Sequence, residues 1–203
     1  MEIAELAELL RPFAELNPQQ LADTLTYINL LQKWNSRINL TAVRRPQEMV
    51  TRHFGESFFA AQTLLAKDYA GTILDLGSGA GFPGVPMAMS AARATVTLIE
   101  SNGKKAAFLN EVIRILKLPN VVVFSRRAEE YPSSSSLVVM RAIEHFEASL
   151  VLASRLVELE GRLAVMIGGA QVDRAISLVP RCRWEQPILV PASQSRVLLI
   201  GTL

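Results

Sequence analysis

A glycine-rich segment is the part of this sequence best suited to bind a small molecule. Residues 75–84 read DLGSGAGFPG and follow an apolar run at 72–76 that has the length of a buried strand. Glycines in such a loop let the backbone turn tightly and approach a ligand closely. A helix that begins after the loop offers free N–H groups to a negatively charged group. The segment therefore predicts a nucleotide-type cofactor, with Gly77 and Gly79 at the ligand; the alternative is a plain connecting turn.

Two carboxylates narrow the choice of cofactor. Glu100 ends the next apolar run, about twenty residues beyond Gly77, which is the spacing of an acid that binds ribose hydroxyls. Asp75 stands just before the glycines, where we expect it at the mouth of the site. A carboxylate there repels a pyrophosphate and suits a cofactor that carries amino and sulfonium cations. These features favour S-adenosylmethionine over NAD.

Arg141 is the most informative single charge. It follows the apolar run at 137–140, so we expect it at the carboxyl edge of the sheet, where ligands bind in open α/β folds. It is our candidate catalytic residue, in contact with the cofactor or the substrate; the alternative is a surface arginine. We expect both histidines, His53 and His145, to be structural. The single cysteine, Cys182, has no partner at metal-binding spacing, so we predict no metal site.

The net charge of +2 conceals two basic segments, residues 33–56 and 103–127, on either side of the glycine-rich loop. Each of them alone is consistent with an ordinary solvated surface. Together they favour a polyanionic partner such as RNA. The candidate phosphate-binding residues are Arg37, Arg44, Arg45, Arg52, Lys104 and Lys105.

The elements that position these residues fall into two parts. Residues 1–67 predict a helical extension, with helix starts at Pro18, after the cap Asn17, and at Pro46. Residues 68–203 alternate strands and helices, which indicates a mostly parallel α/β sheet with helices on both faces and an antiparallel C-terminal strand pair. The expected strands are 72–76, 94–99, 121–124, 137–140, 162–167, 184–190 and 196–200, and the expected helices are 85–91, 104–116, 147–159 and 172–179.

Six segments in order give the chain a family resemblance. From about Leu30 to Gly169 it resembles the class I, Rossmann-like S-adenosylmethionine-dependent methyltransferases, and among them the bacterial 16S rRNA guanine-N7 methyltransferases of the RsmG or GidB type. The segments are KWNSRINLTAVR at 33–44, HFGES at 53–57, GFPG at 81–84, ESNGKK at 100–105, RAEE at 127–130 and RA at 141–142. Glu56 stands where this family has aspartate, and Met166-Ile167 precede Gly168 where it has a lysine.

The resemblance implies roles for individual residues. Gly77 and Phe82 would line the cofactor pocket, Glu100 would hold the ribose, and Ala128 and Glu129 would flank the adenine. Arg141 would lie by the cofactor and the incoming base.

The resemblance also implies a substrate, guanine N7 in a decoding-region loop of 16S rRNA, as free RNA, in the small subunit or in an assembly intermediate. Guanine N7 has a lone pair and no proton, so in-line transfer needs alignment rather than a general base.

Composition sets outer limits. The chain has 203 residues, is 50% hydrophobic and has a mean hydropathy of +0.25, which argues against extended disorder. We find no signal peptide or membrane-spanning run, and expect a cytoplasmic monomer. Three alternatives stay open: a methyltransferase of this fold that acts on a small molecule or protein, an NAD-type oxidoreductase, and a cofactor-sensing RNA-binding protein without catalysis.

Overall fold

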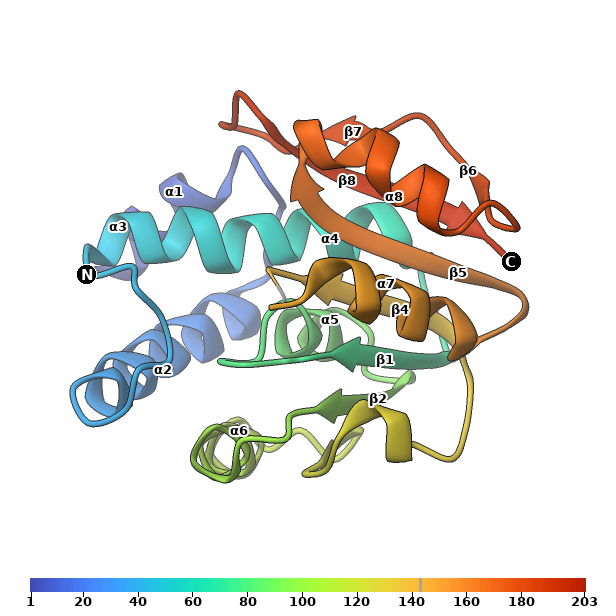
Figure 1. Ribbon diagram of the computed structural model, residues 1–203. Helices are drawn as coiled ribbons and strands as arrows, with labels where there is room; N and C mark the ends of the chain where they lie inside the picture. Colours follow the sequence, from blue (N-terminus) through green and yellow to red (C-terminus); the bar gives the residue numbers. More distant parts are fainter. Residues whose placement is uncertain (143) are drawn as a thin grey trace.

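One eight-stranded sheet organises the protein in the computed structural model, which describes residues 1–142 and 144–203 (Figure 1). Its order is β3-β2-β1-β4-β5-β8-β6, and β7 also pairs with β8. The first five strands are parallel, whereas β8 runs antiparallel to β5, β6 and β7. The predicted sheet is confirmed. The strands are β1 (Thr72–Leu76), β2 (Thr95–Ile99), β3 (Val121–Phe124), β4 (Ser135–Arg141), β5 (Val157–Gly168), β6 (Arg183–Trp184), β7 (Ile188–Leu189) and β8 (Arg196–Thr202).

Helices cover both faces of the sheet, and each face has its own hydrophobic core. One core packs the N-terminal helices, α5 and α6 on the sheet, and the other packs α7 and α8 (Figure 1). The helices are α1 (Ile3–Leu10), α2 (Pro18–Asn35), α3 (Pro46–Met49), the π-helical turn η1 (Val50–Gly55), α4 (Glu56–Leu64), α5 (Gly84–Ser90), α6 (Gly103–Leu116), the 3-10 turn η2 (Ala128–Glu130), α7 (Phe146–Arg155), the 3-10 turn η3 (Gly169–Gln171) and α8 (Val172–Leu178).

The extension begins its long helix as the sequence predicts. The Asn17 side chain accepts a hydrogen bond from the backbone N–H of Gln20 at 2.9 Å, and the Gln20 side chain accepts one from Asn17 N–H at 3.0 Å. This reciprocal pair satisfies two backbone donors at the helix start. The last helix of the extension ends at Leu64 and the first strand begins at Thr72, and the two parts share one core.

Two predicted elements differ most from the structure, and the strand expected over 162–167 begins earlier, at Val157. The helix expected over 147–159 ends at Arg155, because Val157 already pairs with Ser135 of β4. An apolar run of this kind fits both a helix and a strand until its pairing partner is known. The strand expected over 184–190 is two short strands, β6 and β7, interrupted at Pro187, which has no N–H to donate. Among the described residues, no helix is both long and apolar enough to cross a membrane.

Candidate active site

Three of the predicted residues meet at one edge of the sheet. The chain leaves β3 at one end of the sheet and returns to β4 on the other side of β1, so strand order reverses between β1 and β4. Open α/β sheets bind ligands at the carboxyl ends of the strands beside such a reversal. The glycine-rich loop follows β1, Glu100 follows β2, and Arg141 ends β4. The topology therefore brings these residues to the carboxyl edge of the sheet, and their role as a site stays a prediction.

The loop backbone holds the Glu100 carboxylate. Gly77 and Gly79 adopt left-handed φ angles of 68° and 57°. The N–H of Gly79 donates to Glu100 Oε2 at 3.0 Å, and the N–H of Asn102 donates to Glu100 Oε1 at 2.7 Å. A Cβ placed on Gly79 would find only the carbonyl oxygen of Gly77 within 4 Å, at 3.8 Å, so the loop faces open space there.

This arrangement fits the ribose of S-adenosylmethionine. A carboxylate only accepts hydrogen bonds and can accept more than one at each oxygen, so Glu100 keeps capacity for two hydroxyl donors. Ala128 and Glu129 lie in η2, which follows β3, and β3 pairs with β2 up to Ile99 opposite Phe124. The two residues predicted to flank the adenine therefore follow the strand next to the one that Glu100 follows.

Asp75 does not lie at the mouth of the site, which corrects our expectation. Strand side chains alternate between faces, and Asp75 shares its face with Ile73, toward the core under the extension. It is fully buried, and its Oδ2 accepts the N–H of Gly84 at 3.0 Å. Burial raises its pKa to about 7. A Cβ on Gly84 would come within 2.6 Å of Asp75 Oδ2, so this buried contact requires glycine.

Aromatic side chains of the extension pack against the glycine-rich loop. Phe82 stacks on Tyr27 at 5.4 Å and on His53 at 5.1 Å between ring centres, and the residue is 8% exposed. The Tyr27 hydroxyl donates to the carbonyl of Ala80. Burial and the neighbouring Asp75 raise the pKa of Tyr27, so the donor stays protonated. The extension thus helps to set the loop conformation, and most of the Phe82 ring packs against it.

The KWNSRINLTAVR segment at 33–44 is held by hydrogen bonds within itself and is hydrogen-bonded to His53. Asn35 Oδ1 accepts from the N–H groups of Leu40 and Thr41 at 2.9 and 3.0 Å. Thr41 Oγ1 lies 2.7 Å from His53 Nε2. Burial, with smaller contributions from Arg141 and Arg52, lowers the pKa of His53 to about 3. His53 is therefore neutral, and as a hydrogen-bonded ring stacked on Phe82 it links this segment to the loop.

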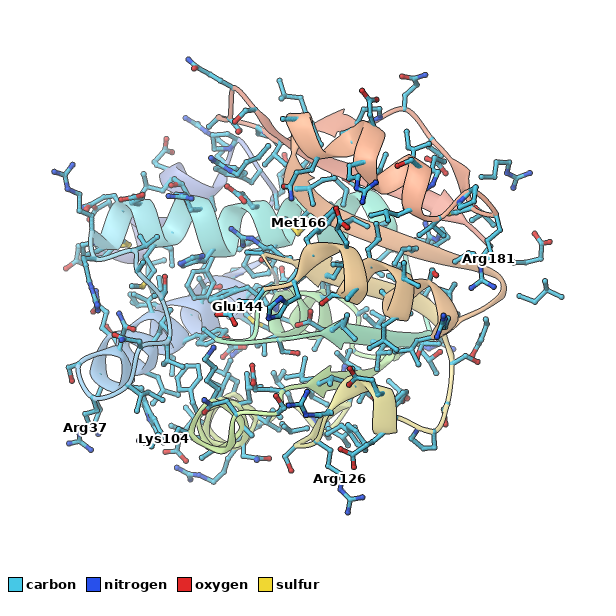
Figure 2. All side chains as sticks on the ribbon, in the orientation of Figure 1. Arg37, Lys104, Arg126, Glu144, Met166 and Arg181 are labelled. Atoms are coloured by element: carbon cyan, nitrogen blue, oxygen red, sulfur yellow. The ribbon has the colours of Figure 1, made fainter. Side chains whose placement is uncertain are left out.

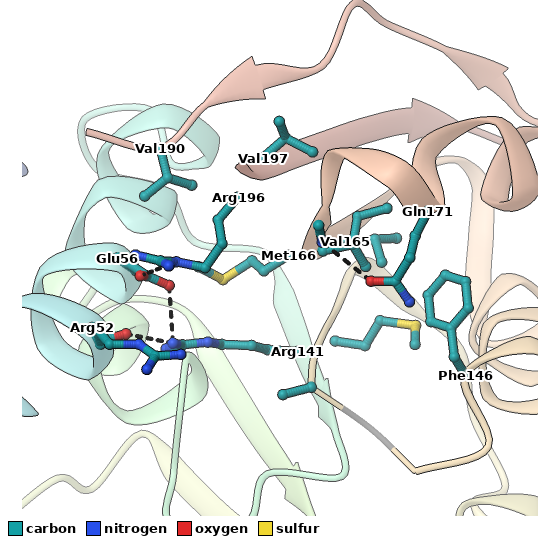
Figure 3. Close-up of a pocket in the computed structure, with 14 residues that line it drawn as sticks. Arg52, Glu56, Arg141, Phe146, Val165, Met166, Gln171, Val190, Arg196 and Val197 are labelled. Atoms are coloured by element: carbon teal, nitrogen blue, oxygen red, sulfur yellow. Dashed lines mark hydrogen bonds and ion pairs between the residues drawn. The ribbon is translucent and has the colours of Figure 1, made fainter. Parts of the chain in front are cut away.

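Arg141 reaches back to the extension (Figure 3). Its Nη2 donates to Glu56 Oε2 at 2.9 Å and to the carbonyl of Arg52, and its Nη1 donates to the carbonyl of His53 at 3.5 Å. Glu56 Oε1 accepts from Arg196 Nε at 2.6 Å. Burial lowers the pKa of Arg141 and Glu56 opposes that shift. Glu56, 2% exposed, therefore joins α4 to β4 and β8.

A pocket of about 200 Å³ adjoins this cluster (Figure 3). One end is charged, with Arg52, Glu56, Arg141 and Arg196, and the other is largely apolar, with Phe146 among the side chains that line it. Sequence reasoning missed Arg196, because no local signal relates it to Glu56, 140 residues earlier. The remaining lining residues are Met140, Ala142, Val165, Met166, Ile167, Gly168, Gln171, Val190 and Val197.

Three of the six predicted RNA-binding residues line one pocket. Arg37, Lys104 and Lys105 line a shallow groove of about 330 Å³ together with Asn39 and Asn102, and Figure 2 shows Arg37 beside Lys104.

The other three cations lie just before α3 and in η1. Arg44 and Arg45 are exposed where α3 begins, and Arg52 forms an ion pair with Glu48 at 3.0 Å while lining the pocket. Within residues 1–142 and 144–203, no three His, Cys, Asp or Glu side chains are grouped to hold a metal ion.

Solved structures share the fold. An S-adenosylmethionine-dependent methyltransferase from Aquifex aeolicus superimposes with a TM-score of 0.63 at 15% identity, over 87% of this chain and 97% of that one. A ribosomal protein L11 methylase from Lactobacillus delbrueckii subsp. bulgaricus gives 0.63 at 11% identity, over 74% and 78%.

Sequence comparisons show the family. "Ribosomal RNA small subunit methyltransferase G" of Xylella fastidiosa is 39% identical over 181 residues, 87% of this chain and 84% of that one. The protein of that name from Xanthomonas euvesicatoria pv. vesicatoria is 42% identical over 149 residues, 72% and 68% of the two chains. Residues 20–188 match the family described as rRNA small subunit methyltransferase G. The cofactor is S-adenosylmethionine rather than NAD, and the chain belongs to the rRNA small subunit methyltransferase G family.

Proposed function

We propose that this protein transfers the methyl group of S-adenosylmethionine to N7 of a guanine in a decoding-region loop of 16S rRNA, in the small subunit or an assembly intermediate. The relatives from Xylella and Xanthomonas carry a name that specifies small-subunit ribosomal RNA, which supports this substrate. Such a substrate makes the cytoplasm the expected location, and the protein is expected to act as a monomer.

The observation that carries the proposal is that the acids and the histidine described at this edge are either held by hydrogen bonds or buried. Two arginines hold Glu56, two N–H groups hold Glu100, and Asp75 lies buried beneath the loop. His53, with its pKa near 3, is a poor base. When bound, S-adenosylmethionine supplies an electrophilic methyl group on a sulfonium. An acceptor without a proton, such as guanine N7, needs positioning and no base.

The residues of this chain then have separate tasks. Glu100 holds the ribose, the backbone of Gly77 and Gly79 lines the cofactor, and Ala128 and Glu129 flank the adenine. Asp75 acts indirectly, by fixing the start of α5, and Phe82 fixes the loop through Tyr27 and His53.

Arg141 lines the pocket, where it would orient the incoming nucleotide. The six cations would contact phosphates: Arg37, Arg44, Arg45, Arg52, Lys104 and Lys105. Because Met166-Ile167 replace the lysine expected from the resemblance, these residues would carry more of the RNA contact.

Methyl transfer to defined RNA tests the proposal. Small subunits and free 16S rRNA that lack the modification are incubated with the protein and tritiated S-adenosylmethionine, and the RNA is then reduced with borohydride and treated with aniline. Strand cleavage at the labelled nucleotide is specific to 7-methylguanosine and is the expected result. Label without cleavage would exclude N7, and no label on either RNA would refute the proposal.

A further inference from the structure

The wall of the pocket carries an excess of positive charge. Glu56 is the one carboxylate among the described pocket-lining residues, and it is shared by Arg141 and Arg196. The Arg141 side chain is 11% exposed and the Glu56 side chain 2%, so water screens this charge poorly. A third cation, Arg52, stands at the rim, paired with Glu48. A partly buried site with more cations than anions favours an anionic ligand.

Arg196 is oriented but not saturated. Glu56 holds its Nε at 2.6 Å, which fixes the plane of the guanidinium. Within the described part of the chain its Nη groups form no hydrogen bonds, and the side chain is 36% exposed. An arginine fixed in this way presents donors in a rigid fork that matches an oxyanion. Arg196 begins β8 and pairs with Gly168, at the carboxyl end of β5, so it lies at the same sheet edge as Arg141.

We infer that Arg196, held by Glu56 and acting with Arg141, forms an oxyanion subsite that receives a phosphate of the RNA substrate. The inference rests on the proposed function and adds the position of one nucleotide: its phosphate at the charged end of the pocket, its base at the apolar end. Phe146 lines that end, is partly exposed, and offers apolar surface to a planar ring (Figure 3).

A carboxylate of the cofactor has the same oxyanion chemistry, and the location favours phosphate. The pocket is built from β4, β5, β8 and η1–α4, and neither residues 75–84 nor Glu100 line it. The glycine-rich loop and Glu100, which we propose hold the cofactor, follow β1 and β2 on the other side of the strand reversal. The subsite therefore lies at the part of the carboxyl edge of the sheet that the cofactor would not occupy, where the RNA substrate can bind.

The test compares Arg196→Gln, Arg196→Lys and the matched control Arg183→Gln in the full-length protein. Arg183 is an exposed arginine of β6 that lines a different surface, with Tyr69 and Arg162. For each variant three quantities are measured: the affinity for S-adenosylmethionine by calorimetry, the affinity for 16S rRNA at several salt concentrations, and the thermal midpoint. Arg196→Lys keeps a cation beside Glu56, so it tests the subsite even where Arg196→Gln folds poorly.

We expect Arg196→Gln to weaken RNA binding roughly tenfold and to lower the slope of log affinity against log salt by about one. Its affinity for S-adenosylmethionine should stay at the wild-type value. Arg196→Lys should keep the wild-type slope with a smaller loss of affinity, and Arg183→Gln should match wild type throughout.

Two outcomes overturn the subsite. In the first, cofactor affinity falls while the RNA salt slope stays unchanged, which would assign the arginines to the cofactor carboxylate. In the second, a folded Arg196→Gln binds both ligands like wild type. If the wild-type protein fails to methylate 16S rRNA but Arg196→Gln still lowers the salt slope of RNA binding as predicted, the proposed function fails and the phosphate subsite stands.

Discussion

Arg141 and Glu56 form a nearly buried ion pair, 2.9 Å from Nη2 to Oε2, between residues 85 apart in the sequence. The carboxylate belongs to the first turn of α4 and the guanidinium to the last residue of β4. The candidate catalytic arginine is therefore positioned by the helical extension. The other oxygen of Glu56 positions Arg196, so one acid of the extension orients two cations at the sheet edge.

We expect Glu56→Gln to destabilise the protein by about 3 kcal/mol, because it leaves two partly buried arginines side by side without an anion. Urea denaturation at pH 7 measures this. The matched control is Glu48→Gln, which breaks the Arg52 pair whose side chains are 44% and 42% exposed. Such surface pairs contribute about 0–1 kcal/mol. Equal losses for both variants would show that the buried cluster does not depend on its charge.

Tyr27→Phe tests whether the extension shapes the cofactor loop. The variant keeps the ring that stacks on Phe82 and removes the hydroxyl that donates to the Ala80 carbonyl. An unsatisfied buried acceptor costs about 1–3 kcal/mol, and we expect a loss in this range together with weaker binding of S-adenosylmethionine in calorimetry.

Tyr69→Phe is the matched control, because the Tyr69 hydroxyl lies 2.8 Å from Ser136 Oγ, near the start of β4 and away from the carboxyl edge of the sheet. It should lose stability without losing cofactor affinity. If Tyr27→Phe binds S-adenosylmethionine as tightly as wild type, the extension does not determine the conformation of the cofactor loop.

The pH dependence of stability should report on His53. The folded protein keeps this ring neutral down to about pH 3, whereas the unfolded chain protonates it near 6.5. Between these values the unfolded state binds the extra proton, so this group lowers stability as the pH falls. Asp75 acts in the opposite sense: the folded state retains its proton up to about pH 7, and the unfolded state loses it near 3.8, so its contribution falls as the pH rises.

His53→Gln removes the His53 contribution to the pH dependence of stability and leaves that of Asp75. Relative to wild type, we expect the variant to lose about 1–2 kcal/mol less stability between pH 7 and pH 5, measured by urea denaturation at both values. The exposed His145→Gln serves as the control and should follow wild type. Parallel pH profiles for His53→Gln and wild type would contradict a buried, neutral His53.

Reversing the charge at the start of α3 tests the RNA surface. We expect the double variant Arg44→Glu, Arg45→Glu to weaken 16S rRNA binding and to lower its salt slope by about two. A control of equal charge change is Lys67→Glu, Arg93→Glu, since these residues are exposed and precede β1 and β2, at the opposite edge of the sheet. If both double variants bind RNA alike, the effect reflects total charge and α3 does not contact RNA.

Local signals were sufficient for most of the fold. The cap at Asn17, the short apolar runs and the glycine-rich loop depend on neighbours in sequence, so Thr72–Leu76 and Val121–Phe124 could be predicted to the residue. The switch from α7 to β5 could not, because Val157 becomes a strand residue only by pairing with Ser135.

The site divides in the same way. Glu100 and the loop are close in sequence and were predictable, but the burial of Asp75 depends on the extension covering one face of the sheet. The contacts of Tyr27 with Ala80 and of Arg196 with Glu56 span 53 and 140 residues. A single sequence carries no periodic pattern from which such long-range contacts can be predicted, because they depend on how separate elements pack together.

Gly81 illustrates such a long-range requirement and gives the last prediction. Its φ is +88°, and a Cβ there would collide with the Tyr27 hydroxyl and come within 2.9 Å of Val85 Cγ2. A left-handed backbone alone costs a non-glycine residue about 1–2 kcal/mol, and the collision adds to this. We expect Gly81→Ala to destabilise the protein by about 3 kcal/mol and to abolish S-adenosylmethionine binding. Gly103→Ala, at the first position of α6 with nothing within 4 Å of its added Cβ, should be neutral or stabilising by about 0.5 kcal/mol in the same urea titration. Similar losses for the two variants would mean that Tyr27 moves aside at little cost, so the extension would not fix the loop.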